Sequence, residues 1–215
     1  MDNISEIAAS VREAFDHQTE IRDKMLIQAR SLTRHAAHAI RAIHRNEYDL
    51  ANEHLKDAST LVSNLKNALT EYPQLFYAGY TQDALKEFAE ANITLALIQN
   101  QPLPTPEVLG LENATYLNGL AETTGELRRR CLDILRKGYS DEAERLLGCM
   151  DEIYSLLVTI DYADAITNGL RRQTDLVRGI LERTRGDLTL SLREQELQQT
   201  IKSYIDRLLQ TTGSN

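Results

Sequence analysis

Residues 83–96 read Asp-Ala-Leu-Lys-Glu-Phe-Ala-Glu-Ala-Asn-Ile-Thr-Leu-Ala. Helix-forming residues dominate this stretch, and apolar residues recur at helical spacing along it, at Ala84, Phe88, Ala91, Leu95 and Ile98. Beside this apolar stripe, Asp83, Glu87 and Glu90 follow at offsets of four and three, which makes them neighbours on one helix face. Carboxylates held close together disfavour one another's ionisation unless a cation or solvent relieves the repulsion. The stretch therefore predicts an amphipathic helix that carries an acidic row.

A second acidic pair, Glu122 and Glu126, has helical spacing in a predicted helix over residues 113–137. Gly119 and Gly125 lie in the same helix, where each costs about 1 kcal/mol relative to alanine. Close approach of a neighbouring helix would explain both glycines. If the two acidic helices pack side by side, their carboxylates converge, and such hard oxygen ligands suit Mg²⁺ or Mn²⁺. The pattern therefore predicts a divalent-metal site.

Several other kinds of site are disfavoured by the sequence. Ferritin-like di-iron sites need a Glu-x-x-His pair, and none of the five histidines follows a glutamate by three. There is no phosphate-binding Walker loop, and Cys131 and Cys149 lie singly in apolar helical patterns as structural thiols. Carboxylates with Mg²⁺ then indicate hydrolysis of a phosphate ester, in which the metal activates water and stabilises the leaving oxygen.

The whole chain has the patterning of an all-α protein. It has no tryptophan, four prolines and no strand-like alternation. Three of the prolines lie in a linker at residues 101–110. The expected N-cap residues are Thr81, Thr105 and Ser140. We expect Gly186-Asp187 to end a helix. We expect one domain over residues 1–215 with a flexible tail at 211–215. The predicted long helices cover residues 5–45, 47–70, 81–99, 113–137, 140–160, 164–184 and 189–209.

The first predicted helix carries a row of basic side chains opposite its apolar face. This row is either a solvated surface or a contact surface for nucleic acid. The net charge of −8 argues against a general affinity for nucleic acid, so binding would use this local surface. His35, His38 and His44 do not form a zinc motif, because no third ligand follows His35 and His38 at the required spacing. The basic row comprises Arg22, Lys24, Arg30, Arg34, His38, Arg41 and Arg45.

Targeting signals are absent from the sequence. No run approaches the roughly 20 apolar residues that span a bilayer, and the first residues lack the basic and apolar regions of a signal peptide. We therefore expect a cytoplasmic protein without a membrane partner.

Three segments resemble the translin family, on the side of its catalytic member, translin-associated factor X. Lys86-Glu-Phe-Ala-Glu-Ala91 is similar to the family's Gln-Glu-Tyr-Val-Glu-Ala motif, and Leu120-Ala-Glu-Thr-Thr-Gly-Glu-Leu127 to its Ala-Asp-Leu-Thr-Gly-Glu-Leu motif. The run from Ile21-Arg-Asp-Lys24 through Ala29-Arg-Ser31 to Ile43-His-Arg45 resembles the family's basic first helix. The similarity covers roughly residues 12–205, in the family's order and spacing.

The resemblance implies a seven-helix bundle of long antiparallel helices and assembly into a hollow octamer. It further implies Mg²⁺-dependent cleavage of single-stranded RNA inside the chamber, with single-stranded DNA as the alternative partner. The family's metal-binding acids correspond to Glu87, Glu90 and Glu122, and Glu126 matches the glutamate of its Thr-Gly-Glu segment. We therefore expect these four as catalytic residues, the first three as metal ligands, and Mn²⁺ as the alternative ion. Residues expected to hold RNA phosphates are Arg30, Arg34, His44 and Arg45.

The chain also departs from the family's pattern. Glu122 stands where the family has its catalytic aspartate, which extends the carboxylate by one methylene. The non-catalytic partner, translin proper, has a basic stretch before the acidic helix, whereas residues 79–85 here contain no base. The short linker replaces a long insert of larger relatives. These features fit a compact archaeal or bacterial-type member that assembles with itself.

Three other functions remain open at the level of sequence. A non-catalytic oligomer that binds single-stranded RNA or DNA would use the basic row without the acids. An all-α nucleoside triphosphate pyrophosphohydrolase also pairs Glu-x-x-Glu with a second acidic helix around Mg²⁺, although it has Glu-x-x-Asp where Gly125 stands here. A helical scaffold would carry the acids only as a solvated face.

Overall fold

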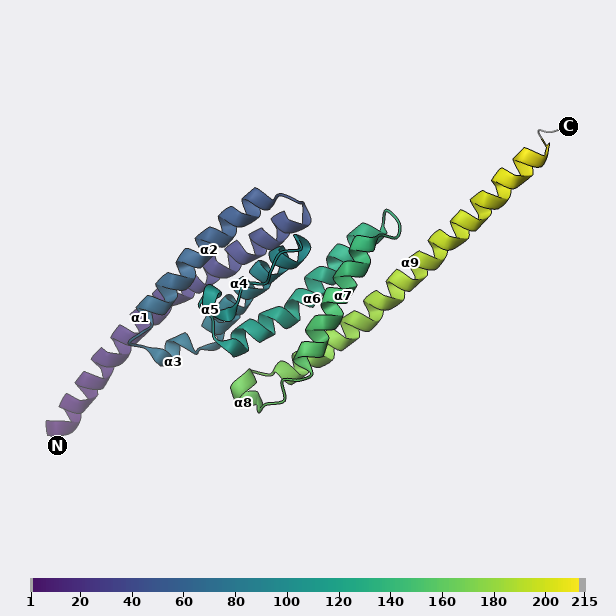
Figure 1. The fold of residues 1–215 in the computed structure, drawn as a ribbon. Helices are drawn as coiled ribbons and strands as arrows, with labels where there is room; N and C mark the ends of the chain where they lie inside the picture. Colours follow the sequence, from purple (N-terminus) through teal and green to yellow (C-terminus); the bar gives the residue numbers. More distant parts are fainter. Residues whose placement is uncertain (1, 213–215) are drawn as a thin grey trace. The chain divides into compact units, whose positions relative to one another are not determined.

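The computed structural model describes residues 2–212, which form helices and no strand, so the all-α prediction is confirmed. Within this range, six helices are long and three are single turns, against the seven predicted. Figure 1 shows α1 (Asp2–His44), α2 (Tyr48–Ala68), α3 (Pro73–Phe76), α4 (Gly79–Ile98), α5 (Pro106–Leu109), α6 (Asn113–Leu135), α7 (Asp141–Leu157), α8 (Asp164–Thr167) and α9 (Leu170–Thr212). None of the helices in residues 2–212 combines the length and apolarity needed to cross a bilayer.

The chain divides into two compact units, Met1–Gly119 and Leu120–Asn215, and the boundary falls inside α6. The linker at 101–110 therefore lies within the first unit. The expectation of one domain over residues 1–215 remains a prediction. Thr211 and Thr212 still belong to α9, and the rest of the predicted tail lies outside the described residues.

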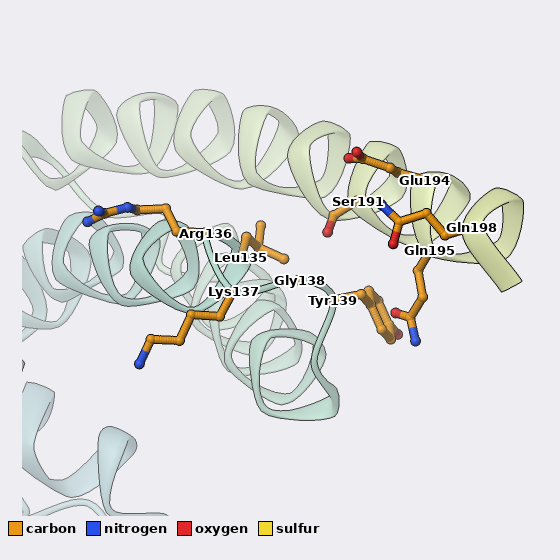
Figure 2. A pocket seen from close by; sticks show the side chains of 9 residues that line it. All are labelled: Leu135, Arg136, Lys137, Gly138, Tyr139, Ser191, Glu194, Gln195 and Gln198. Atoms are coloured by element: carbon orange, nitrogen blue, oxygen red, sulfur yellow. The ribbon is translucent and has the colours of Figure 1, made fainter. Parts of the chain in front are cut away.

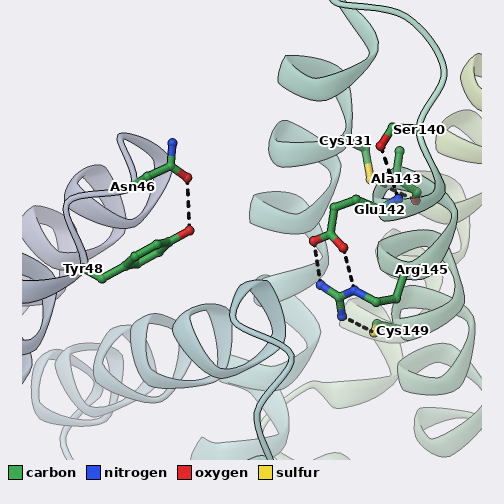
Figure 3. A network of polar contacts seen from close by, with 8 residues as sticks. All are labelled: Asn46, Tyr48, Cys131, Ser140, Glu142, Ala143, Arg145 and Cys149. Atoms are coloured by element: carbon green, nitrogen blue, oxygen red, sulfur yellow. Dashed lines mark hydrogen bonds and ion pairs between the residues drawn. The ribbon is translucent and has the colours of Figure 1, made fainter.

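In the first unit, α1 and α2 run side by side in opposite directions and α4 packs against both (Figure 1). α4 buries the apolar stripe that the sequence predicts for the acidic helix. Asn46 turns the chain between α1 and α2 at φ 62°, a conformation that asparagine tolerates better than most residues. The Tyr48 hydroxyl donates a hydrogen bond to Asn46 Oδ1 at 3.0 Å (Figure 3). Fully buried side chains in this unit include Leu32, Ile43, Leu65, Leu69, Leu85 and Ile93.

The predicted caps in the first unit have different outcomes. The prediction of Thr81 as the N-cap of the acidic helix is wrong, because α4 begins at Gly79 and Ala78 occupies the N-cap position. The Thr81 hydroxyl is fully buried and donates instead to the Leu75 carbonyl oxygen at 2.9 Å. Thr105 does cap α5, because its hydroxyl accepts from the Val108 N–H.

In the second unit, the predicted cap Ser140 is confirmed, since its hydroxyl accepts from the Glu142 N–H at 3.3 Å (Figure 3). The Arg145 guanidinium donates two hydrogen bonds to the Glu142 carboxylate, at 2.8 and 2.7 Å. Cys131 is fully buried on α6, and its thiol donates to the Ala143 carbonyl oxygen at 3.7 Å. Burial, followed by the charge of Glu142, raises the pKa of Cys131 from 9.0 to about 11. Cys131 is therefore a structural thiol that links α6 to α7.

The predicted helix break at Gly186-Asp187 is wrong, because α9 runs without interruption from Leu170 to Thr212. The cost of one glycine in a helix, about 1 kcal/mol, is offset here by burial of Leu188 and an ion pair of Asp187 with Arg128 at 2.9 Å. The real interruption is Asn168-Gly169, where both residues have positive φ values of 51° and 79°. These two left-handed residues end α8 and set the direction in which α9 begins.

Candidate functional site

Glu87 and Glu90 lie together on α4, where the acidic row was predicted. Glu90 is only 9% exposed and Glu87 is half-buried. A carboxylate oxygen of Glu87 lies within 4.8 Å of one of Glu90. Asp83, which the spacing placed in the same row, has a 74% exposed side chain that pairs with Lys86 at 3.9 Å. The glutamate pair is therefore shielded from water, whereas Asp83 is exposed to it.

The environment of this glutamate pair suits a divalent cation. A carboxylate removed from water is costly unless charge or hydrogen bonds compensate it, and a neighbouring carboxylate raises that cost. Mg²⁺ binds oxygen at about 2.0–2.1 Å, so two oxygens on opposite sides of the ion are about 4.2 Å apart. The limit of 4.8 Å on the Glu87–Glu90 oxygen separation is close to this distance. The two residues therefore fit the metal that the sequence predicts.

Gly119, on the first part of α6, makes a very close contact with α4. A Cβ atom built on Gly119 would lie 2.6 Å from the Ala89 Cβ and 2.9 Å from the Lys86 carbonyl oxygen. The predicted reason for this glycine, close approach of a helix, is confirmed. The same reasoning is wrong for Gly125, where an added Cβ would meet nothing within 4 Å in the described part of the chain.

Glu122 and Glu126 both lie half-buried on α6 in the second unit. The Gln173 side-chain amide on α9 donates to Glu122 Oε1 at 3.0 Å. Glu126 pairs with Arg129, one turn away, at 3.8 Å. Sequence reasoning missed Gln173, since a lone glutamine 51 residues from its partner gives no local signal.

The predicted phosphate-binding residues lie on the second half of α1 and just beyond it. Arg30, Arg34 and Arg45 are exposed, and His44 is half-buried in the last turn of the helix. Exposed guanidinium groups on one helix can contact successive phosphates of a nucleic-acid strand. Their role in binding remains a prediction.

A polar depression in the second unit is separate from all of these residues. The turn between α6 and α7 forms one side, and α9 forms the other with Ser191, Glu194, Gln195 and Gln198 (Figure 2). The side chains of Arg136 and Lys137 point away from these polar groups. No predicted site residue lines the depression, and it concentrates no charge of one sign.

Comparisons with known proteins show what the fold is similar to. No family model matches the chain. The uncharacterized protein MJ0175 of Methanocaldococcus jannaschii is 32% identical over 189 residues, which is 86% of this chain and 83% of that protein. Among solved structures, AfC3PO in complex with duplex RNA is 32% identical, with a TM-score of 0.79 over 86% of this chain and 96% of that one.

Two further structures agree with this assignment. AfC3PO alone is 31% identical, with a TM-score of 0.79 over 86% of this chain and 97% of that one. Apo-NeC3PO shares the fold, with a TM-score of 0.77 over 85% of this chain and 96% of that one. Its sequence identity to this chain is 21%. The sequence identity to AfC3PO and the common fold over most of both chains show that this chain belongs to the translin family.

Proposed function

We propose that this protein is a Mg²⁺-dependent endoribonuclease that cleaves single-stranded RNA inside a hollow homo-oligomer. The observation that carries the proposal is the pair Glu87 and Glu90, partly withdrawn from water on α4 beside the close contact of Gly119. In this proposal these acids are catalytic, which supports an assignment to the translin-associated factor X side of the family. We propose a compact archaeal or bacterial-type member that works in the cytoplasm.

In this proposal Glu122 completes the ligand set. It follows Gly119 by three residues on the continuous helix α6, which places both on one helix face. The proposal takes Glu122 as the third ligand because it stands where the family has its catalytic aspartate. The hydrogen bond from Gln173 would orient the Glu122 carboxylate for metal binding. Mg²⁺, or Mn²⁺ in its place, would supply Lewis acidity and an activated water to phosphodiester hydrolysis.

The remaining residues would bind the substrate and move a proton. Arg30, Arg34 and Arg45 would neutralise RNA phosphates from the exposed side of α1, with His44 at its last turn. Glu126, one helical turn after Glu122, would accept the proton of the attacking water or act as a further ligand. An octamer would enclose these groups in one chamber.

Single-stranded and double-stranded RNA have to be compared as substrates, because the AfC3PO structure contains duplex RNA. Single strands expose their bases and flexible backbone to a metal site, whereas a duplex presents a regular A-form surface. We expect single-stranded RNA to be cleaved and a blunt duplex of the same sequence to be bound without cleavage. A cleaved duplex would move the substrate assignment to double strands.

The decisive experiment measures cleavage of labelled single-stranded RNA with Mg²⁺, with Mn²⁺ and with a chelator. Glu90→Gln and Glu87→Gln should each lower the rate about 100-fold or more, because each removes a charged ligand. The matched control is Asp83→Asn, an exposed carboxylate on the same helix, which should leave the rate unchanged. Equal rates for the wild type and Glu90→Gln would reject the proposal. Turnover of free nucleoside triphosphates would indicate a pyrophosphohydrolase instead.

A second candidate, a non-catalytic oligomer that binds single-stranded RNA or DNA, is favoured by the exposed arginines of α1. It predicts salt-dependent binding that survives replacement of both Glu87 and Glu90, with no cleavage in any metal. A mass measurement in solution, with and without RNA, gives the number of subunits in either case.

A further inference from the structure

Four potential metal ligands meet where α1 and α2 pack against each other in the first unit. His35 and His38 are three residues apart on α1, and His54 and Asp57 are three residues apart on α2. Residues three apart share a helix face, so each helix presents a pair. The sequence interpretation found no third ligand near His35 and His38. Packing of the helices supplies it from a position 19 residues away.

The distances within this histidine–aspartate cluster are close to those of tetrahedral coordination. His35 Nδ1 lies 3.4 Å from His54 Nδ1 and 3.8 Å from Asp57 Oδ2. One ligand atom from each of the three residues lies within 4.8 Å of the others. In a tetrahedral zinc site with bonds of about 2.0–2.1 Å, neighbouring ligand atoms are about 3.3–3.4 Å apart. The two imidazole nitrogens already have this separation. Rotation of the exposed Asp57 side chain would shorten the distance from its carboxylate to His35.

Direct contacts between these side chains explain the arrangement poorly. Hydrogen bonds from N–H to an acceptor are commonly about 2.9–3.0 Å long, and the contact between the two imidazoles is 3.4 Å. The contact of His35 Nδ1 with Asp57, at 3.8 Å, is longer still. A shared ion would satisfy all three groups at these separations.

His38 offers a fourth ligand. Its ring centroid lies 5.1 Å from that of His54, and its side chain is exposed and able to rotate. Its two ring nitrogens are of the kind that coordinates transition-metal ions. Arg34 and Arg41 are the nearby cations, and the carboxylate of Asp57 offsets part of their repulsion toward an ion.

We propose that His35, His54 and Asp57 bind a transition-metal ion of the Zn²⁺ class, with His38 or water as the fourth ligand. Imidazole nitrogen suits Zn²⁺, Co²⁺, Ni²⁺ and Cu²⁺, whereas Mg²⁺ prefers oxygen. The site is therefore chemically distinct from the Glu87 and Glu90 pair and stands independently of the proposed nuclease activity. The bound ion would link α1 to α2 next to the row of basic side chains on α1.

The test uses the full chain and Co²⁺ as a spectroscopic probe for Zn²⁺. The wild type should show the intense visible absorption of tetrahedral Co²⁺, saturating at one such ion per chain, and Zn²⁺ should abolish this absorption. The double variant His35→Gln/His54→Gln should lose this signal. Asp57→Asn, at an exposed position that leaves the fold intact, should weaken binding about tenfold or more. Circular dichroism verifies that each variant is folded.

Two controls separate this site from other sources of metal binding. His17→Gln removes a histidine on α1 whose ring packs against Tyr72 rather than the cluster, and should leave the Co²⁺ signal unchanged. Glu87→Gln/Glu90→Gln should also leave it unchanged. A wild type that lacks the tetrahedral Co²⁺ spectrum, or a double variant that keeps it, overturns the proposal. Loss of RNA cleavage in Glu90→Gln has no bearing on it.

Discussion

Gly119 of α6 lies so close to Ala89 of α4 that a methyl group on the glycine would stand 2.6 Å from the alanine Cβ. Carbon atoms in ordinary contact are about 3.5–4.0 Å apart. Two helix backbones meet at this point, because the Lys86 carbonyl oxygen is also within 2.9 Å of that position. The contact lies next to Glu90, so the packing of α6 bears directly on the environment of the glutamate pair.

Gly119→Ala should destabilise the protein by about 1–3 kcal/mol, because the added methyl group meets a backbone that must move. The matched control is Gly125→Ala on the same helix, where an added Cβ meets nothing within 4 Å. It should stabilise the protein by up to about 1 kcal/mol through helix propensity. Chemical denaturation of both variants checks the difference. Equal effects would contradict the close contact.

The continuity of α9 can be tested with a second pair of glycines. Gly186→Ala should raise the free energy of unfolding by up to about 1 kcal/mol, because Gly186 lies inside a helix with open space around it. Gly169→Ala should lower the free energy of unfolding by about 1 kcal/mol or more, because φ of 79° strains any residue with a Cβ. Thermal unfolding distinguishes the two signs. Destabilisation by Gly186→Ala would restore the helix break that the sequence predicts.

Stability above pH 9 should depend on Cys131. Burial raises the pKa of this thiol to about 11 in the folded protein, so the unfolded chain loses the proton at a lower pH than the folded protein does. The contribution of the protonated Cys131 thiol to the free energy of unfolding is complete below pH 9 and is lost toward pH 11. The total loss is roughly 2–3 kcal/mol. Urea unfolding of the wild type and Cys131→Ala between pH 8 and pH 10.5 isolates it. Parallel pH profiles would contradict the raised pKa.

Arg34→Ala should weaken RNA binding and reduce the slope of log affinity against log salt by about 0.7–1, because one phosphate contact is lost. The matched control is Arg12→Ala, an exposed arginine on the same helix outside the group of Arg30, Arg34 and Arg45. It removes the same charge and should leave the slope unchanged. Fluorescence anisotropy over a salt series measures both. Identical slopes for the two variants would remove Arg34 from the binding surface.

Gln173→Leu should weaken Mn²⁺ binding and RNA cleavage about tenfold, because Glu122 loses the hydrogen bond that orients it. The effect of Glu122→Gln should be larger, since that change removes the ligand charge itself. Raising the Mn²⁺ concentration should rescue Gln173→Leu and leave Glu122→Gln inactive. A Gln173→Leu variant with wild-type metal dependence would show that the hydrogen bond only joins α6 to α9.

Much of the local structure follows from the sequence. Helical periodicity identifies the long helical segments and the buried face of α4, and Asn46, Thr105 and Ser140 mark boundaries by their own backbone and capping preferences. The burial of Glu90 follows from its place beside the apolar stripe of α4. Gly186 was misread as a helix break, because the compensating burial of Leu188 and the contact of Asp187 with Arg128 come from elsewhere in the chain.

Tertiary structure alone decides which helix faces meet. Gly119 and Gly125 look alike in sequence, but only Gly119 lies against another backbone in the described residues. His35 gains His54 as a neighbour, and Glu122 gains Gln173, through packing of residues far apart in the chain. The physical reason is that periodicity encodes which side of a helix is apolar, whereas the partner of that side depends on shape and burial summed over the whole core.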